Sequence, residues 1–373
     1  MTLRLSSLAV LAILAASLPG AQAQAASDEA PVPSAEPPAP SRIEPLAGYD
    51  RFDVRAAHRG VLVAASIWYP ASDRIYAAPV GGNAVFESTM ALVGAAAAPG
   101  SHPLVLLSHG SGGNMDGLGW LSSQLALRGA LVVAVNHPGT TSGDSSPRRT
   151  TRLDERAKDL SAALDTILAD PSFGPLIDGK RITALGFSLG GTTVLDLAGG
   201  RFEREKYRDY CKTFADQGDC VFFRKGGVDL DRLPEGMEAD VRDPRISSIV
   251  AVEPGMTDAL SDDSIGAMTL PVQLIGLGSP DAWRGVDVSA SGSDLAARLP
   301  DATYEMIRPA VHFTFLGLCK PEAARLLAEE QDDPVCTDPE GSDRAAIHTR
   351  VIERISRFLG LAAVPGETSA AHQ

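Results

Sequence analysis

Basic residues are scarce in this sequence. Among its 373 residues, 33 Lys and Arg stand against 47 Asp and Glu, which gives a net charge of −14. A protein that binds nucleic acid through counterion release needs a basic surface, so the composition argues against a nucleic-acid partner. Aromatic residues amount to only 5%, whereas hydrophobic residues reach 44% and glycines number 36. Small and aliphatic side chains therefore dominate, and a chain of this length can bury one large core in a single domain.

Long apolar runs are missing beyond the N-terminus, where Arg4 precedes a stretch of apolar residues over 5–18. That stretch is too short to span a bilayer, which counts against the alternative of a retained membrane anchor. Small residues follow at Ala21, Ala23 and Ala25, in the pattern of a cleavage site. Residues 1–25 are therefore predicted to be a signal peptide, and the mature protein is expected to be secreted or periplasmic without stable membrane insertion.

Only four cysteines occur, and no two of them have the CxxC spacing typical of zinc sites. Cys211 and Cys220 lie close together in one polar stretch, and Cys319 and Cys336 bracket another. Disulfides fit an exported protein. Of the three possible connectivities, the local one pairs Cys211 with Cys220 and Cys319 with Cys336. Each bridge would contribute roughly 2–3 kcal/mol of stability.

Short apolar runs alternate with helical patterns along most of the chain. Apolar residues three or four apart predict a helix, as in the series Ala157, Leu160, Leu164 and Ile167. Strands are expected at 60–69, 103–108, 130–135, 181–185, 246–252 and 272–275 and from residue 304, and helices at 118–128, 154–168 and 345–359 and from residue 192. This alternation predicts an α/β fold, with a mostly parallel sheet covered by helices on both faces.

Three segments fall outside this pattern. Residues 26–45 are rich in Pro, Ala and Ser and are predicted to be a flexible leader, whereas residues 363–373 form a polar tail. The folded domain is predicted over 46–362. Within it, the charged stretch 200–244 is predicted to be an insertion over the C-terminal edge of the sheet. A cap or lid is one interpretation of the insertion, and a solvated surface excursion is the other.

A nucleophile motif follows the strand predicted at 181–185. The run Gly186-Phe187-Ser188-Leu189-Gly190 matches G-x-S-x-G, in which a sharp strand-to-helix turn raises the serine hydroxyl above the sheet. The glycines let strand and helix approach closely. Because an apolar strand precedes the motif and a helical pattern follows, Ser188 is predicted to be the nucleophile rather than part of an ordinary Gly/Ser turn. The backbone N–H of Leu189 is predicted to donate to an oxyanion.

A second glycine-rich turn, His109-Gly110-Ser111-Gly112-Gly113, follows the strand predicted at 103–108. A fold of this kind places its other oxyanion donor here, and we assign it to the backbone N–H of Ser111. A phosphate-binding loop is the alternative, but the turn has neither the Lys-Ser/Thr of a P-loop nor GxGxxG. His109 precedes the serine in the chain and is expected to be structural.

The general base should follow the serine and the acid, in the order Ser, Asp/Glu, His. Three histidines follow Ser188, namely His312, His348 and His372. His372 lies in the polar tail and His348 in the amphipathic helix predicted at 345–359. His312 lies in a turn after a predicted strand, from which it can reach the serine. His312 is therefore predicted to be the base, with a structural loop histidine as the alternative.

Two carboxylates compete for the role of the acid. Glu253 directly follows the strand predicted at 246–252, and a carboxylate at the end of an apolar strand is costly unless it is paired. Asp281 lies in the loop after the next strand, which is the commoner station for this acid. An aspartate in that loop can also be an ordinary turn residue. The sequence pattern favours Glu253 as the acid, and Asp281 remains the alternative.

With these motifs placed, residues 46–360 resemble one branch of the α/β-hydrolase superfamily. It contains dienelactone-hydrolase-like esterases, platelet-activating-factor acetylhydrolase-like proteins and cutinase-like polyester hydrolases. The resemblance rests on the segments IWYPA (67–71), LSHGSGG, NHPGTTSGD (136–144), GFSLGG and HFTFL (312–316). Acetylhydrolase-like relatives carry the acid where Glu253 stands, and cutinase-like relatives carry it where Asp281 stands. Dienelactone hydrolases proper use a cysteine nucleophile. Because this chain has Ser188 in that place, the name describes kinship rather than substrate.

The resemblance implies a serine carboxylesterase or lipase acting on a small-molecule or lipid ester. The predicted residues would form a Ser-His-acid triad that works through an acyl-enzyme and needs no metal or organic cofactor. The NHPG loop is expected to be structural rather than to line the pocket through His137 or Thr140. Two other classes stay open. One is an amidase or acyltransferase that uses the same triad, and the other is a catalytically silent binding protein.

Overall fold

The structure is a computed structural model that describes residues 45–278 and 283–364. The predicted signal peptide, residues 26–44 of the leader, Asp281 and residues 365–373 of the tail lie outside the described residues. By their contacts, all the described residues belong to one compact unit, and every element below lies in it. Within the described ranges, no helix has both the length and the apolar character that crossing a membrane requires.

Ten described strands form the central sheet: β1 (Gly48–Val54), β2 (Val63–Tyr69), β3 (Ala77–Val80), β4 (Thr89–Val93), β5 (His102–Ser108), β6 (Leu131–Val135), β9 (Ile177–Phe187), β10 (Ser248–Val252), β11 (Val272–Leu277) and β12 (Ala302–Ile307). Their order is β12-β11-β10-β9-β5-β6-β2-β1-β4-β3. Neighbours from β6 across to β12 run parallel. Strand β2 joins both β6 and β1 in antiparallel fashion. The prediction of a mostly parallel sheet is confirmed.

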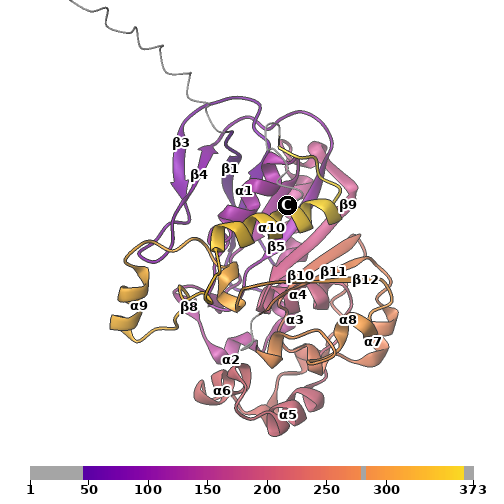
Figure 1. Ribbon diagram of the computed structural model, residues 1–373. Helices are drawn as coiled ribbons and strands as arrows, with labels where there is room; N and C mark the ends of the chain where they lie inside the picture. The colour runs from indigo at the N-terminus through magenta and orange to yellow at the C-terminus, as the bar shows by residue number, and fades with distance from the viewer. Residues whose placement is uncertain (1–44, 279–282, 365–373) are drawn as a thin grey trace, which may run out of the picture. The chain divides into compact units, whose positions relative to one another are not determined.

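Helices cover both faces of this sheet. Helices α1 (Gly119–Leu127) and α10 (Arg344–Phe358) pack on one face, and α3 (Leu153–Ala169) and α4 (Leu189–Leu197) pack on the other. Figure 1 shows α10 lying across the sheet. In β5, Leu104 and Leu106 join the cluster of α3 and α4, whereas Val105 and Leu107 join that of α1 and α10. Successive side chains of a strand point to opposite faces, so a strand in a sheet covered on both sides needs apolar residues on both of its faces.

The predicted insertion at 200–244 contains α5 (Arg204–Thr213) and α6 (Gly218–Lys225). The disulfide Cys211–Cys220 joins these two helices, and their buried Tyr207 and Phe223 belong to the same hydrophobic cluster as α3. Figure 1 shows α6 beside the short helix α2 (Pro147–Thr150). The segment contributes to the core, which a wholly solvated excursion would not do. Its role as a cap or lid stays a prediction.

The shorter elements include β7 (Thr140–Thr141), β8 (Asp144–Ser145), α7 (Asp262–Ala267), α8 (Leu295–Arg298), α9 (Ala323–Glu330) and the 3₁₀ helix η6 (His312–Phe315). The second disulfide, Cys319–Cys336, encloses α9. The local cysteine pairing predicted from the sequence is therefore confirmed.

Candidate active site

Ser188 lies in a sharp turn between β9 and α4, with a backbone φ of 56° and ψ of −121°. A positive φ is strained for a residue that is not glycine, so the surrounding packing must hold it. Gly186 and Gly190 allow that packing. A Cβ atom on Gly186 would lie 2.0 Å from the carbonyl oxygen of Gly190, and one on Gly190 would lie 1.9 Å from the carbonyl oxygen of Ser108. The motif therefore has the local geometry of a nucleophile elbow.

Three predicted residues meet at this turn. The Nε2 atom of His312 lies 3.0 Å from Ser188 Oγ, and its Nδ1 atom lies 3.1 Å from Glu253 Oε2. The other carboxylate oxygen of Glu253 accepts a hydrogen bond from the backbone N–H of Leu277 at 2.6 Å. Because a carboxylate can only accept, Nδ1 carries the imidazole proton and leaves Nε2 free to accept from the serine hydroxyl. The geometry suits base-assisted attack by Ser188.

Glu253 reaches His312 because of where β10 ends. The residue directly follows Val252, has a φ of 48°, and is 5% exposed. Its backbone N–H donates to the carbonyl oxygen of Ile275 in β11 at 2.9 Å, which fixes the turn. Asp281, the other candidate acid, lies outside the described residues.

Aromatic rings enclose the imidazole of His312. Phe187 lies on one side with ring centroids 4.7 Å apart, and Trp283 stacks on the ring at 5.0 Å. Such packing restricts rotation of the imidazole. Sequence reasoning did not single out either aromatic residue. Phe187 sits inside the G-x-S-x-G motif and was identifiable there, whereas nothing in the spacing of Trp283 indicates a contact with His312.

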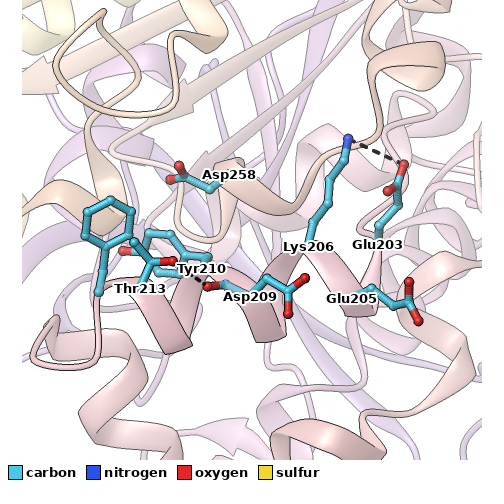
Figure 2. Close-up of a pocket in the computed structure, with 8 residues that line it drawn as sticks. Glu203, Glu205, Lys206, Asp209, Tyr210, Thr213 and Asp258 are labelled. Atoms are coloured by element: carbon cyan, nitrogen blue, oxygen red, sulfur yellow. Dashed lines mark hydrogen bonds and ion pairs between the residues drawn. The ribbon is translucent and has the colours of Figure 1, made fainter.

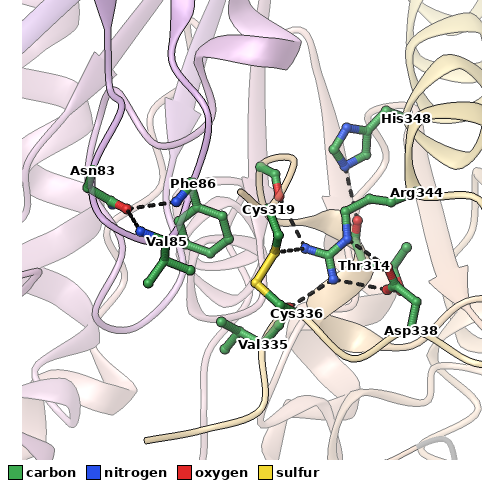
Figure 3. The surroundings of a disulfide bond; sticks show 11 residues. Asn83, Val85, Phe86, Thr314, Cys319, Val335, Cys336, Asp338, Arg344 and His348 are labelled. Carbon is green, nitrogen blue, oxygen red and sulfur yellow. Dashed lines mark hydrogen bonds and ion pairs between the residues drawn. A yellow bond between two sulfur atoms is a disulfide. The ribbon is translucent and has the colours of Figure 1, made fainter. Parts of the chain in front are cut away.

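A cluster of polar side chains, shown in Figure 3, makes hydrogen bonds to the turn that carries His312. The hydroxyl of Thr314 donates to Asp338 at 2.7 Å, and Arg344 donates to the same carboxylate at 2.9 and 3.0 Å. His348 bonds the carbonyl oxygen of Thr314 at 3.0 Å. Burial lowers the pKa of His348 to about 4, so this ring is neutral at neutral pH. His348 is structural in this arrangement, and His372 lies outside the described residues.

The second glycine-rich turn lies directly beside the serine. A Cβ atom on Gly110 would lie 3.2 Å from Ser188 Cβ. The carbonyl oxygen of Gly110 accepts hydrogen bonds from His109 Nδ1 at 2.7 Å and from the Gly113 N–H at 3.1 Å. In a trans peptide the N–H points opposite to the carbonyl, so the N–H of Ser111 points away from these two partners. This orientation makes it available as a donor to a bound group.

The NHPG loop packs behind that turn rather than lining a pocket. His137 has no exposed surface and Thr140 is 2% exposed. His137 bonds Asp159 at 2.9 Å and Ser108 at 3.0 Å. The expectation of a structural loop is confirmed for both residues.

A hollow of about 450 Å³ lies over α5 (Figure 2). It is lined by Glu203, Glu205, Lys206, Asp209, Tyr210, Thr213, Phe214 and Asp258. Most of these side chains are acidic or polar, and none belongs to the group formed by Ser188, His312 and Glu253. The hollow is thus separate from the candidate active site.

A mostly parallel sheet covered on both faces, with a strained serine at a strand-to-helix turn, defines the class of α/β hydrolases. The chain belongs to the alpha/beta hydrolase family, because the sequence model of that family matches residues 104–371. The resemblance noted from the sequence is thereby confirmed at the level of the family.

Individual relatives match shorter stretches. A lipase of a Moraxella species is 40% identical over 79 residues, which cover 21% of this chain and 22% of the relative. A cutinase of Thermobifida alba is 32% identical over 99 residues, which cover 26% and 30% of the two proteins. The chain thus matches less than a third of either relative. A ferulic acid esterase from Streptomyces cinnamoneus, 20% identical, superposes with a TM-score of 0.57 over 90% of this chain and 96% of its own, which shows a common fold.

Proposed function

We propose that this protein is a serine hydrolase that cleaves carboxylic esters through a Ser188-His312-Glu253 triad. The observation that carries the proposal is the chain of hydrogen bonds from Ser188 Oγ to His312 Nε2 and from His312 Nδ1 to Glu253. Ester cleavage is favoured over amide hydrolysis because a lipase and a cutinase are among the proteins that match part of the chain. The two disulfides support a location outside the cytoplasm.

In the proposed mechanism, Ser188 Oγ attacks the ester carbonyl carbon while its proton passes to His312 Nε2. The N–H groups of Ser111 and Leu189 stabilise the negative charge on the former carbonyl oxygen, each contributing about 3 kcal/mol by mutational precedent. The C–O bond to the alcohol then breaks, and the alcohol leaves with the proton from His312. Water repeats the sequence on the acyl-enzyme and releases the carboxylic acid. Glu253 holds the imidazole tautomer and stabilises the imidazolium.

The experiment that tests this function is an ester assay on the purified protein. The substrates are p-nitrophenyl acetate, p-nitrophenyl butyrate and a long-chain p-nitrophenyl ester, each compared with the matching anilide. We expect ester turnover in the wild type, loss of turnover in Ser188→Ala, and labelling of the wild type alone by a fluorophosphonate. A wild type that neither cleaves the esters nor takes the label would refute the enzymatic function. Preferred cleavage of the anilides would identify an amidase instead.

A further inference from the structure

Arg156, on α3, is an arginine with only 1% of its surface exposed. A buried guanidinium is tolerated only when its donors find acceptors, and this one has four. Its Nη2 atom donates to the carbonyl oxygen of His109 at 2.5 Å and to Ser108 Oγ at 3.1 Å. Its Nη1 atom donates to Thr140 Oγ1, and its Nε atom donates to Thr193 Oγ1 at 2.8 Å. The proposed triad uses none of these contacts.

These hydrogen bonds reach both turns that carry the proposed oxyanion donors. On one side, the bond to the His109 carbonyl fixes the peptide that leads into the turn of Ser111. On the other side, the hydroxyl of Thr193 accepts from Arg156 and donates to the carbonyl oxygen of Leu189 at 2.8 Å. The two turns come from different parts of the chain, one after β5 and one after β9. Arg156 therefore connects the turn of Ser111 to the turn of Leu189 through hydrogen bonds.

A short relay of side chains links Arg156 to Asp159, a carboxylate that also pairs with Arg59 at 2.7 Å. Ser108 Oγ lies 3.0 Å from His137 Nε2, and His137 Nδ1 lies 2.9 Å from Asp159 Oδ2. Burial, followed by the charge of Arg156, lowers the pKa of His137 to about 3, so its neutral ring donates to Asp159 and accepts from Ser108. Burial lowers the pKa of Arg156 to about 9, which leaves the guanidinium protonated at neutral pH. A positive charge thus lies behind the turns.

We propose that Arg156 is a positioning residue for the oxyanion hole, which fixes the Ser111 turn against the Leu189 turn and places a positive charge behind both. The inference rests on the proposed function, because an oxyanion hole matters only if Ser188 attacks a carbonyl group. Donors that are already in place need no reorganisation as negative charge develops. Loosening them should therefore destabilise the transition state more than the bound ester.

Two variants test this role on the full-length protein. Thr193→Val removes the hydroxyl between Arg156 and Leu189 while keeping the shape of the side chain and the buried charge. Arg156→Lys keeps the charge, but a single ammonium cannot serve all the acceptors of the guanidinium. On p-nitrophenyl butyrate we expect kcat to fall about 10-fold in the first and about 100-fold in the second, with KM within about twofold. Rates are normalised to active sites by complete fluorophosphonate titration.

The second readout is the affinity for a trifluoromethyl ketone, whose adduct with a serine carries an oxyanion. That affinity should fall by about the same factor as kcat. Thr183→Val is the matched control, since Thr183 is also buried and its hydroxyl lies 2.8 Å from that of Ser248, away from the turns. This control should lower stability without changing kcat or the inhibitor affinity.

Wild-type kcat and inhibitor affinity in Thr193→Val would overturn the role of Arg156, as would equal losses in the two threonine variants. If Arg156→Lys does not fold, the kcat and the inhibitor affinity of Thr193→Val decide whether Arg156 has this role. Failure of the proposed function has a different signature. In that case the wild type itself would fail to cleave the esters and to take the fluorophosphonate label, or Ser188→Ala would retain turnover.

Discussion

Gly190 packs so closely against the carbonyl oxygen of Ser108 that a Cβ atom on the glycine would lie 1.9 Å from that oxygen. Both partners of this contact are backbone, so no side-chain rotation can relieve a larger residue. The contact brings the end of β5 against the first turn of α4. In consequence Ser188 lies beside the glycine-rich turn that follows β5.

Gly190→Ala is expected to lower the free energy of unfolding by about 3 kcal/mol, because the added methyl group must displace backbone. The matched control is Gly266→Ala in α7, where an added Cβ meets nothing within 4 Å. Alanine is the better helix former there, so the control should be neutral or slightly stabilising. Urea unfolding monitored by circular dichroism measures both variants. Equal midpoints for Gly190→Ala and the wild type would contradict the close contact.

The identity of the acid is tested by exchanging each candidate carboxyl for an amide. Glu253→Gln removes the charge beside His312 Nδ1 and presents an amide that can favour the wrong tautomer. By analogy with amide substitution in serine-protease triads, kcat should fall about 1,000- to 10,000-fold with KM little changed. Asp281→Asn is the control and should keep kcat near that of the wild type. The reverse pattern would assign the acid to Asp281.

The residues that the sequence placed near Ser188 share a local signal. Ser188, Glu253 and the turn of Ser111 each follow an apolar run directly, so the end of a strand could be read next to the candidate residue. Parallel strands then bring those ends to one edge of the sheet. His312 was selected by its order in the chain and by elimination of two other histidines. Strand ends and chain order were sufficient to predict which residues lie near Ser188, because the G-x-S-x-G motif fixes the position of the serine at the end of its strand.

Contacts between distant segments could not be predicted in the same way. Arg156 occupies the buried stripe of α3 with Leu153 and Leu160, and a charge on an apolar face was a usable signal for a buried role. Its partners, however, lie on other elements, and no spacing reveals them. Strand β1 was missed for a different reason. Its exposed Asp50, Arg51 and Asp53 interrupt the apolar pattern, because that strand is not covered evenly on both faces.

The disulfide Cys319–Cys336 is expected to support the turn of His312 as well as the fold. Arg344 donates to the carbonyl oxygens of Gly317 and Val335, at 3.1 and 2.8 Å, and so joins the two segments that the bridge connects (Figure 3). Replacing both cysteines with serine should lower the free energy of unfolding by about 3 kcal/mol. It should also reduce kcat several-fold, because Asp338 then holds Thr314 less firmly.

The disulfide in the 200–244 segment provides the control for that experiment. Replacing Cys211 and Cys220 with serine should cost a similar stability, about 2–3 kcal/mol, but leave kcat unchanged. Urea unfolding and normalised ester turnover are measured on both double variants. Loss of kcat in both, or in neither, would show that Cys319–Cys336 has no particular link to His312.

Asp196 should make the protein less stable as the pH rises. The residue is fully buried in α4, and neither carboxylate oxygen has a hydrogen-bond partner among the described residues. Burial, together with the charge of Asp154, raises the pKa of Asp196 well above its usual value. The folded state therefore keeps this proton at a pH where the unfolded state has released it. Stability falls as the pH rises above the unfolded pKa of about 4.

Asp196→Asn keeps the shape of the side chain and removes its ionisation. The variant should therefore raise the free energy of unfolding, by about 1–2 kcal/mol at pH ~8 and by less at pH ~5. Asp301→Asn, at an exposed position, is the matched control and should change stability little at either pH. Urea unfolding of the three proteins at both pH values gives the comparison. A gain from Asp196→Asn that was the same at both pH values would mean that the buried carboxyl does not retain its proton in the folded state.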